Sequence, residues 1–237
     1  MKQPGRRRRL PRRTAAAIAT VLIAYGGLAY IIAPEFWTIR DRGDADRIDS
    51  YLTTTPQGIP GDPINLGFYA TKGELVHAFA TAGWHAADEI TFRTSIDIGE
   101  SVIFDRPYAD APVSTLIFEG RKQDLAFEKP VGKSADQRHH LRLWRTDQTN
   151  DGGQPLWLGS GSFDRGVGFS HDTGQITHHI GPDLDAERDF VVESLRATGL
   201  VKSVASTEGI GPTRTGRNGG GDPYFTDGLV DICTLGS

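Results

Sequence analysis

The chain has 237 residues, with 26 lysines and arginines against 30 aspartates and glutamates, a formal net charge of −4. Seven of the basic residues lie in the first thirteen positions, so residues 35–237 hold 19 basic and 30 acidic residues, a net charge of about −11. An acidic domain repels phosphate backbones, so we expect no nucleic-acid partner. The single cysteine, Cys233, excludes an intramolecular disulfide and is expected to be a buried core thiol.

The N-terminal segment combines a basic cluster with an apolar stretch. Arginines at positions 6–9, 12 and 13 precede residues 14–33, which hold no charged side chain. A helix of about 20 residues matches the roughly 30 Å hydrocarbon core of a bilayer. Arginines favour the cytoplasmic side, and aromatic residues such as Trp37 suit the opposite headgroup layer. We therefore predict a basic cytoplasmic tail at 1–13 and a transmembrane helix at 14–33. The protein would be a single-pass protein of the cytoplasmic (inner) membrane, with its C-terminal domain extracytoplasmic.

A cleavable signal peptide is the alternative explanation of this segment. Signal peptides usually have an apolar core of about 7–15 residues and a small-residue cleavage site. The apolar stretch here is longer and no such site follows it, so we favour an uncleaved anchor. Residues 34–62 are polar and rich in proline and glycine, which predicts a juxtamembrane linker. Residues 63–237 are long enough for one domain with its own core.

Two segments of this domain are typical of a strand, a helix and a returning strand. In the first, residues 64–69 alternate, and Thr71 and Glu74 have the spacing of a helix capping box. In the second, residues 175–180 form the strand and Asp183 caps the helix. Between these segments, further runs suit antiparallel strands at 114–119, 124–128, 138–146 and 155–163, with a hairpin turn at 150–153.

These elements predict an α+β fold behind one N-terminal transmembrane helix. An antiparallel or mixed β-sheet carries two main helices on one face, and an elaborated ferredoxin-like arrangement is one form that it can take. Cys233 lies in an alternating run at 229–235, which we expect to form the last strand.

Histidines concentrate in the middle of the domain. His139 and His140 lie in one predicted strand, and His178 and His179 in another. Successive side chains of a strand point to opposite faces, so each pair is divided. His139 and His178 share their faces with apolar residues and should point to the core, whereas His140 and His179 lie on the polar faces and can meet there if the two strands are neighbours. We name His140, His179 and the neighbouring Arg142 as the catalytic candidates.

A divalent metal site is one interpretation of these histidines. Neutral imidazoles with a carboxylate suit zinc or a similar ion. The candidate ligands are His139, His171, His178 and Asp172. Adjacent histidines are a weaker signal than a helical pair four residues apart. In the alternative interpretation, the inward histidines are hydrogen-bonded core residues and the outward ones are surface residues.

An anion-binding pocket is a second interpretation of the polar residues. The glycine-rich loop at 216–222 can bring backbone N–H groups close to an anion, although it is neither a Walker P-loop nor a dinucleotide fingerprint. The alternative is a tight surface loop. The ligand-binding candidates are Arg121, Arg138, Arg217, Asn218, Gly219, Gly220, Gly221 and Asp222. Asp164 with Arg165, and Asp124 with Arg121, can equally be structural ion pairs.

Nucleophilic catalysis has little support in the sequence. Ser160 and Ser162 alternate with glycines, but Phe163 and Asp164 follow, so the pattern is not a nucleophile elbow. A flexible strand or a bulge explains these residues better.

Four separated stretches, at 120–130, 138–145, 170–180 and 216–222, resemble the LssY-like C-terminal domain family, over about residues 63–235. The resemblance implies a bacterial cell-envelope setting and a lipid or phosphorylated lipid as the substrate class. The resemblance assigns no catalytic residue to this chain. Members of the family are often fused to DedA-like and phosphatidic-acid-phosphatase-like membrane domains, and one helix can supply neither.

Two functions are compatible with these patterns. In the first, the chain is a membrane-anchored extracytoplasmic binding or accessory module that recognises an anionic lipid or glycan phosphate, or a membrane protein partner. In the second, it is a hydrolase of a phosphorylated envelope lipid, in which a histidine is general base or metal ligand and an arginine stabilises developing charge. We favour the first, because no catalytic motif is complete.

Overall fold

The computed structural model describes residues 11–33, 35–36, 51–87, 115–132, 137–209 and 214–236. The basic tail up to residue 10 and residues 37–50 of the predicted linker lie outside this part. The helical elements are α1 (Arg12–Gly27), the π-helical turn η1 (Leu28–Ile32), α3 (Lys72–Thr81) and α5 (Leu184–Arg196). The strands are β1 (Leu52–Thr54), β2 (Pro60–Pro63), β3 (Leu66–Tyr69), β4 (His85–Ala86), β5 (Ile117–Phe118), β6 (Arg121–Lys122), β7 (Leu125–Pro130), β8 (Arg138–Thr149), β9 (Pro155–Phe169), β10 (Ile176–Ile180), β11 (Val201–Glu208), β12 (Thr215–Arg217), β13 (Pro223–Phe225) and β14 (Leu229–Leu235).

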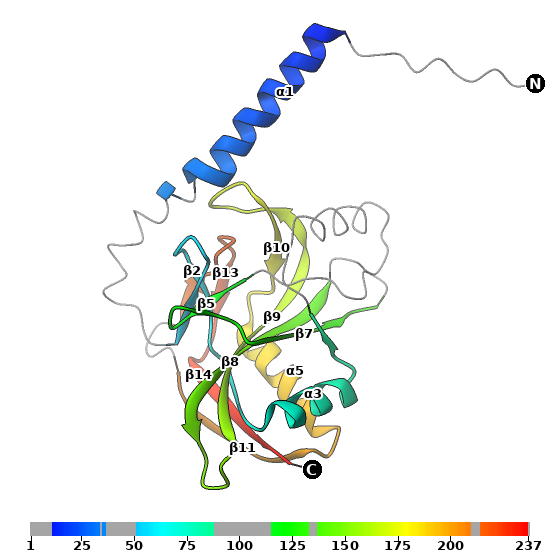
Figure 1. Cartoon of the computed structure of the whole chain (residues 1–237), viewed down its shortest axis with the longest axis vertical. Helices are drawn as coiled ribbons and strands as arrows, with labels where there is room; N and C mark the ends of the chain where they lie inside the picture. The colour runs from blue at the N-terminus through cyan, green and yellow to red at the C-terminus, as the bar shows by residue number, and fades with distance from the viewer. Residues whose placement is uncertain are drawn as a thin grey trace, which may run out of the picture.

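A large mixed sheet forms the centre of the domain (Figure 1). Its strand order is β11-β14-β3-β9-β8-β7-β4, and β10 pairs with the far end of β9. Strands β14 and β3 are parallel, and the other pairs in this sheet are antiparallel. The predicted turn at 150–153 joins β8 and β9, with Gly153 at a positive φ of 76° that glycine adopts without strain. The α+β fold with a mixed sheet is therefore confirmed.

Helices α3 and α5 cover one face of this sheet, as predicted. Thr71 caps α3 by accepting a hydrogen bond from the Glu74 N–H, and the Glu74 side chain accepts one from the Thr71 N–H. The apolar side of α3 buries Phe79, which stacks on Phe127 with ring centroids 4.5 Å apart and meets Phe68 edge to face. Cys233 is buried in the same core, and burial raises its pKa to about 12. This face is apolar throughout its centre.

A smaller sheet covers part of the opposite face. It has the order β2-β1-β5-β6, and the apolar cluster between the two sheets includes Trp144, Phe118 and Leu156. Strand β1 and most of β2 fall inside the segment 34–62 that the sequence marked as linker, and the predicted boundary at residue 63 falls within β2. Pro60 and Pro63 begin and end β2, which lies at the edge of the small sheet, where a missing N–H donor costs little.

The apolar helix expected at 14–33 is present as Arg12–Ile32, which is long and apolar enough to cross a membrane. By length and composition it suits a membrane anchor or a signal sequence. Its C-terminal end contacts the turn between β9 and β10 (Figure 1). The Tyr25 hydroxyl donates to the Gly174 carbonyl at 2.7 Å, and the Gln175 Nε2 donates to the Ala29 carbonyl at 3.0 Å. Tyr25 also meets the exposed Phe169 ring edge to face.

The core between α3 and the sheet generates a stability prediction. Replacing Phe79 by alanine should lower the free energy of unfolding by about 3–5 kcal/mol, because it leaves a cavity among three aromatic rings. The matched control is Val76→Ala on the same helix, whose exposed side chain should change stability by about 0.5 kcal/mol or less. Denaturant unfolding followed by tryptophan fluorescence measures both. Equal effects would contradict the assignment of the buried face.

Candidate functional site

A polar cavity of about 420 Å³ lies on the face of the large sheet away from α3 and α5. Its floor consists of side chains from β8, β9 and β10, and its walls are the loop between β1 and β2 and the glycine-rich loop before β13. Its lining residues include Asp62, Arg138, His140, Arg142, Asp164, Gln175, Thr177, His178, Gly219 and Gly220. We call this cavity the polar pocket.

Alternation along two long strands builds the floor of the polar pocket. Every second residue of β8 points to this face, and every second residue of β9 does the same. The register then places them opposite one another: Arg138 with Asp164, His140 with Ser162, and Arg142 with Ser160. All six are nearly inaccessible to solvent. Buried polar groups of this kind require partners inside the protein.

His140 is the centre of a hydrogen-bonded chain. Its Nδ1 lies 3.1 Å from Asp164 Oδ2, and its Nε2 lies 2.6 Å from Ser162 Oγ. The Ser162 hydroxyl also lies 2.9 Å from Asp62 Oδ2, to which it can donate. A hydroxyl has one proton, so when His140 is neutral with its proton on Nδ1, Ser162 can donate to His140 or to Asp62 at any moment. The proton of the Ser162 hydroxyl can therefore point to either of two acceptors.

Ion pairs balance the charges around this chain. Arg138 donates to Asp164 at 2.9 Å and to Glu128 at 2.7 Å, and all three side chains are buried. Arg142 Nη1 lies 3.8 Å from Asp62 Oδ2, which is beyond hydrogen-bond distance. The two arginines and the two aspartates that line the polar pocket give it no net formal charge.

Burial and these neighbours shift the pKa values of the network. Burial lowers the pKa of His140, and the nearby arginines act in the same direction against the pull of Asp164, so the imidazole is neutral at pH 7. Burial acts to raise the pKa of Asp164, but His140 and Arg138 outweigh it and hold that pKa well below its usual range. Burial lowers the pKa of Arg142, with Asp62 opposing, and its guanidinium remains protonated.

The histidines that line the polar pocket are His140 and His178, so the expectation that His178 points to the main core is wrong. Strand β9 lies between β8 and β10, so the condition for His140 and His179 to share a face is not met. His178 does share a face with Ile180, as the alternation required, but that face is the pocket face. The apolar neighbour was misleading because Ile180 packs against Leu184 and Tyr224 instead of the main core. His139 does point to the core, where it stacks on the Phe190 ring and lies 2.7 Å from Glu187.

His179 belongs to a second cluster beside the polar pocket. Its Nδ1 lies 2.7 Å from Asp222 Oδ1, and the same oxygen lies 3.6 Å from His171 Nε2. The metal candidates are therefore separated: His139 lies in the core, His178 at the polar pocket and Asp172 beside Arg217 at 3.5 Å. His171 alone of the four joins a group of potential ligands.

Several amides of the glycine-rich loop are used within the loop itself. The N–H groups of Gly220 and Asp222 donate to the side-chain Oδ1 of Asn218, and the Gly221 N–H donates to the Asn218 carbonyl. Arg217 donates to the Gly221 carbonyl. Asn218, Gly219 and Gly220 form a wall of the polar pocket.

Of the two ion pairs that the sequence offered as alternatives, Arg121 with Asp124 is present and Asp164 with Arg165 is not. Arg121 lies away from the polar pocket, where it pairs with Asp124 at 3.3 Å and donates to the Arg145 carbonyl. Asp164 pairs with Arg138 and His140, so the pairing expected with Arg165 is wrong. Arg138 and Asp164 are far apart in sequence but meet because β8 and β9 are paired strands. Asp164 and Arg165 are sequence neighbours on one strand, so their side chains point to opposite faces.

Sequence reasoning missed Asp62, Ser162 and Gln175. Asp62 was assigned to the linker, and Ser162 was dismissed because it lacks an elbow. A usable signal did exist: serine, serine and aspartate recur at alternate positions 160, 162 and 164, opposite the alternating arginine, histidine and arginine of β8. Two long strands that are polar at every second position indicate a polar face.

The comparisons with known proteins agree with the motif resemblance. The family model described as LssY C-terminus matches residues 45–230. The chain therefore belongs to this family. The match begins before residue 63, consistent with β1 and β2 as parts of the domain. Neither the comparison with curated proteins nor that with solved structures gives a match.

The lowered pKa of His140 predicts how stability depends on pH. An unfolded chain protonates this histidine near pH 6.5, whereas the folded chain does so only at lower pH. Stability contributed by the neutral ring is therefore lost as the pH falls below about 6.5, by at most about 1.36 kcal/mol per pH unit. His140→Gln should reduce that slope in denaturant unfolding between about pH 7.5 and 5.

The control for this comparison is the parent chain at each pH. Burial raises the pKa of Glu187, so its contribution has the opposite sign, increasing stability as the pH falls from its folded-state pKa. Because Glu187 is present in both chains, subtraction removes its effect. An unchanged slope in His140→Gln would contradict a neutral buried His140.

Proposed function

We propose that the chain is a membrane-anchored binding module of the cell envelope that holds a phosphate-bearing polar headgroup in the polar pocket. The observation that carries this proposal is the position of Gln175. Gln175 lines the polar pocket, and its side chain donates to the Ala29 carbonyl near the end of the apolar helix. The pocket wall and the membrane helix therefore meet at one residue.

The surroundings of this contact suit a bilayer surface. Tyr25 hydrogen-bonds to Gly174, and Phe169 presents a largely exposed ring on the same hairpin. Aromatic rings favour the interface between headgroups and water. This contact supports a position of the polar pocket near the membrane surface.

The chemistry of the polar pocket favours a ligand with both a phosphate and hydroxyl groups. Arg142 and Arg138 supply positive charge, and arginine binds phosphate through a planar fork of donors. Asp62 and Asp164 balance that charge and offer acceptors. A site without net charge gains little from a free multivalent anion, whereas it matches the mixed polarity of a glycerol phosphate or sugar phosphate.

The orientation follows from the arginines before the apolar helix, which favour retention in the cytoplasm. A reporter enzyme that is active only outside the cytoplasm should be active when fused after Ser237 and inactive when fused before Lys2. The opposite activities would refute this topology. A mature protein that begins beyond Ala33 would identify the segment as a signal peptide.

Ligand binding can be tested with water-soluble fragments on the full chain in detergent. Arg142→Gln should weaken binding of glycerol phosphate by about 10- to 100-fold, because a charge-assisted hydrogen bond contributes about 1.5–3 kcal/mol. The matched control is Arg121→Gln, which removes an exposed arginine away from the polar pocket and should have no effect. Isothermal titration calorimetry measures both.

Three probes distinguish the sources of the phosphate. Glycerol phosphate represents a lipid headgroup, glucose 1-phosphate a lipid-linked glycan, and inorganic phosphate a free anion. Binding that depends on Arg142 for the first or second probe supports the proposal and identifies the class. Tightest binding of inorganic phosphate, or equal losses in the two arginine variants, would contradict it.

A hydrolase is the second candidate, because Asp164, His140 and Ser162 lie in the order of an acid–histidine–serine chain. Ser162 is fully buried and is not among the residues that line the polar pocket. Its hydroxyl is also shared with Asp62. The binding function is therefore favoured. Turnover of glycerol phosphate that is lost in both His140→Gln and Ser162→Ala would reverse this preference.

A further inference from the structure

The geometry points to a zinc site formed by His171, His179 and Asp222, outside the polar pocket and against its rim. Each of the three residues offers one ligand atom, and these atoms lie within 4.8 Å of one another. Two imidazoles with one carboxylate form a ligand set that zinc commonly takes in sites with an open position. Among the described residues, these three form the group of histidine and acidic side chains whose ligand atoms lie this close together.

One separation already matches the one that a zinc ion imposes, and a second must open slightly. Zinc lies about 2.0–2.2 Å from nitrogen and carboxylate ligands, so tetrahedral ligand atoms are roughly 3.3–3.6 Å apart. His171 Nε2 and Asp222 Oδ1 are 3.6 Å apart. His179 Nδ1 and Asp222 Oδ1 are 2.7 Å apart, the length of a hydrogen bond. Zinc would replace the proton in this hydrogen bond, and the two atoms would move apart by about 0.6 Å.

Neighbouring groups hold two of the ligands in place. Asp222 is fully buried, its Oδ2 accepts the Ile180 N–H at 3.1 Å, and its own N–H donates to Asn218. Gly168 gives room to the His179 ring, since a Cβ at that position would lie 2.5 Å from Nε2. Groups that fix metal ligands in this manner raise metal affinity by restricting the ligands before binding.

One coordination position would stay open towards solvent. The protein supplies three ligands, and the side chain of His171 is 53% exposed. Arg165 Nη2 lies 3.8 Å from Asp222 Oδ1, but its side chain is 52% exposed and can turn into solvent when a cation binds. A water molecule or an anionic oxygen can occupy the open position.

The site lies on the boundary of the polar pocket. The His171 N–H and the Ser170 hydroxyl both donate to the carbonyl of Gly220, which lines the pocket. Zinc would therefore clamp the β9–β10 turn to the glycine-rich loop, through His171 on one and Asp222 on the other. The zinc site is independent of the proposed phosphate ligand, because the metal ligands are not the arginines that would hold a phosphate.

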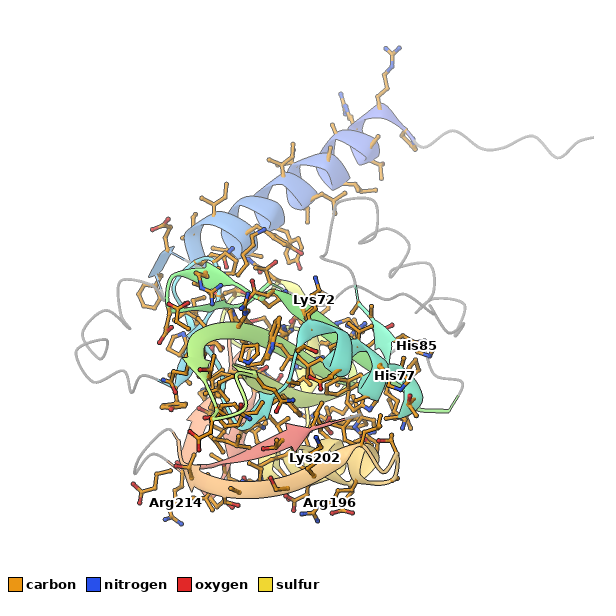
Figure 2. All side chains as sticks on the ribbon, turned by 60° about the horizontal axis from the view of Figure 1, so that its bottom comes forward. Lys72, His77, His85, Arg196, Lys202 and Arg214 are labelled. Atoms are coloured by element: carbon orange, nitrogen blue, oxygen red, sulfur yellow. The ribbon has the colours of Figure 1, made fainter. Side chains whose placement is uncertain are left out.

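The experiment uses the full chain in detergent, purified with a tag that contains no histidine, and Zn²⁺ alone as the probe. We expect one zinc per chain by mass spectrometry of the bound metal. His171→Ala should weaken zinc affinity by at least about 100-fold, because even groups that only orient a ligand contribute 10- to 100-fold. The matched control is His77→Ala, an exposed histidine on α3 (Figure 2), a helix in the half of the domain away from α1 (Figure 1), which should have no effect.

Cobalt gives an independent readout of geometry. Co²⁺ in place of zinc should give the intense visible absorption of four-coordinate cobalt, and His179→Gln should abolish it. Unchanged circular dichroism of the two variants would show that folding is intact. We expect His171→Ala in particular to fold normally, because the His171 side chain is half exposed. Equal zinc affinity in the parent, His171→Ala and His77→Ala chains would overturn the assignment, as would a parent chain that binds no zinc.

Discussion

Asp164 carries a charge inside the domain, on the pocket face of β9, and both Arg138 and His140 depend on it. A buried carboxylate is strongly destabilising unless opposite charge and hydrogen bonds compensate it. Arg138 provides that charge and links Asp164 to Glu128 on the next strand, β7. One carboxylate thus fixes the positions of three strands and of the imidazole that lines the polar pocket. The floor of the polar pocket is therefore one connected network of ion pairs and hydrogen bonds across β7, β8 and β9.

The two faces of the large sheet differ in composition and in role. The face under α3 and α5 is filled by aromatic and aliphatic side chains and supplies most of the hydrophobic stabilisation. The opposite face is divided between an apolar cluster under the small sheet and the polar floor at the far ends of β8 and β9. The apolar face therefore stabilises the sheet that carries the polar pocket, because the buried charges of the pocket contribute little net stability of their own.

Local features of the fold were predictable from sequence because they depend on neighbours in the chain. The Thr71–Glu74 cap, the Asp183 cap and the turn at 150–153 each need only a few adjacent residues. The face of a strand needs more. Alternation correctly paired His178 with Ile180, but which side faced the helices depended on packing against Tyr224, far along the chain. The role of Asp62 was also hidden, since only the pairing of β1 with β2 brings it to Ser162.

The contact between the apolar helix and the β9–β10 turn also bears on how the polar pocket would meet the proposed ligands. The hydrogen bonds of Tyr25 and Gln175 hold the pocket wall at the end of the helix, whatever the length of the connecting segment. If the apolar helix anchors the chain in a bilayer, as proposed, the pocket encounters headgroups at an effective concentration set by the membrane surface, which for short tethers is in the millimolar range. A weak intrinsic affinity then suffices for occupancy, and release into the aqueous phase is fast. For the proposed ligand class, the fold supports repeated sampling of headgroups better than permanent capture of one.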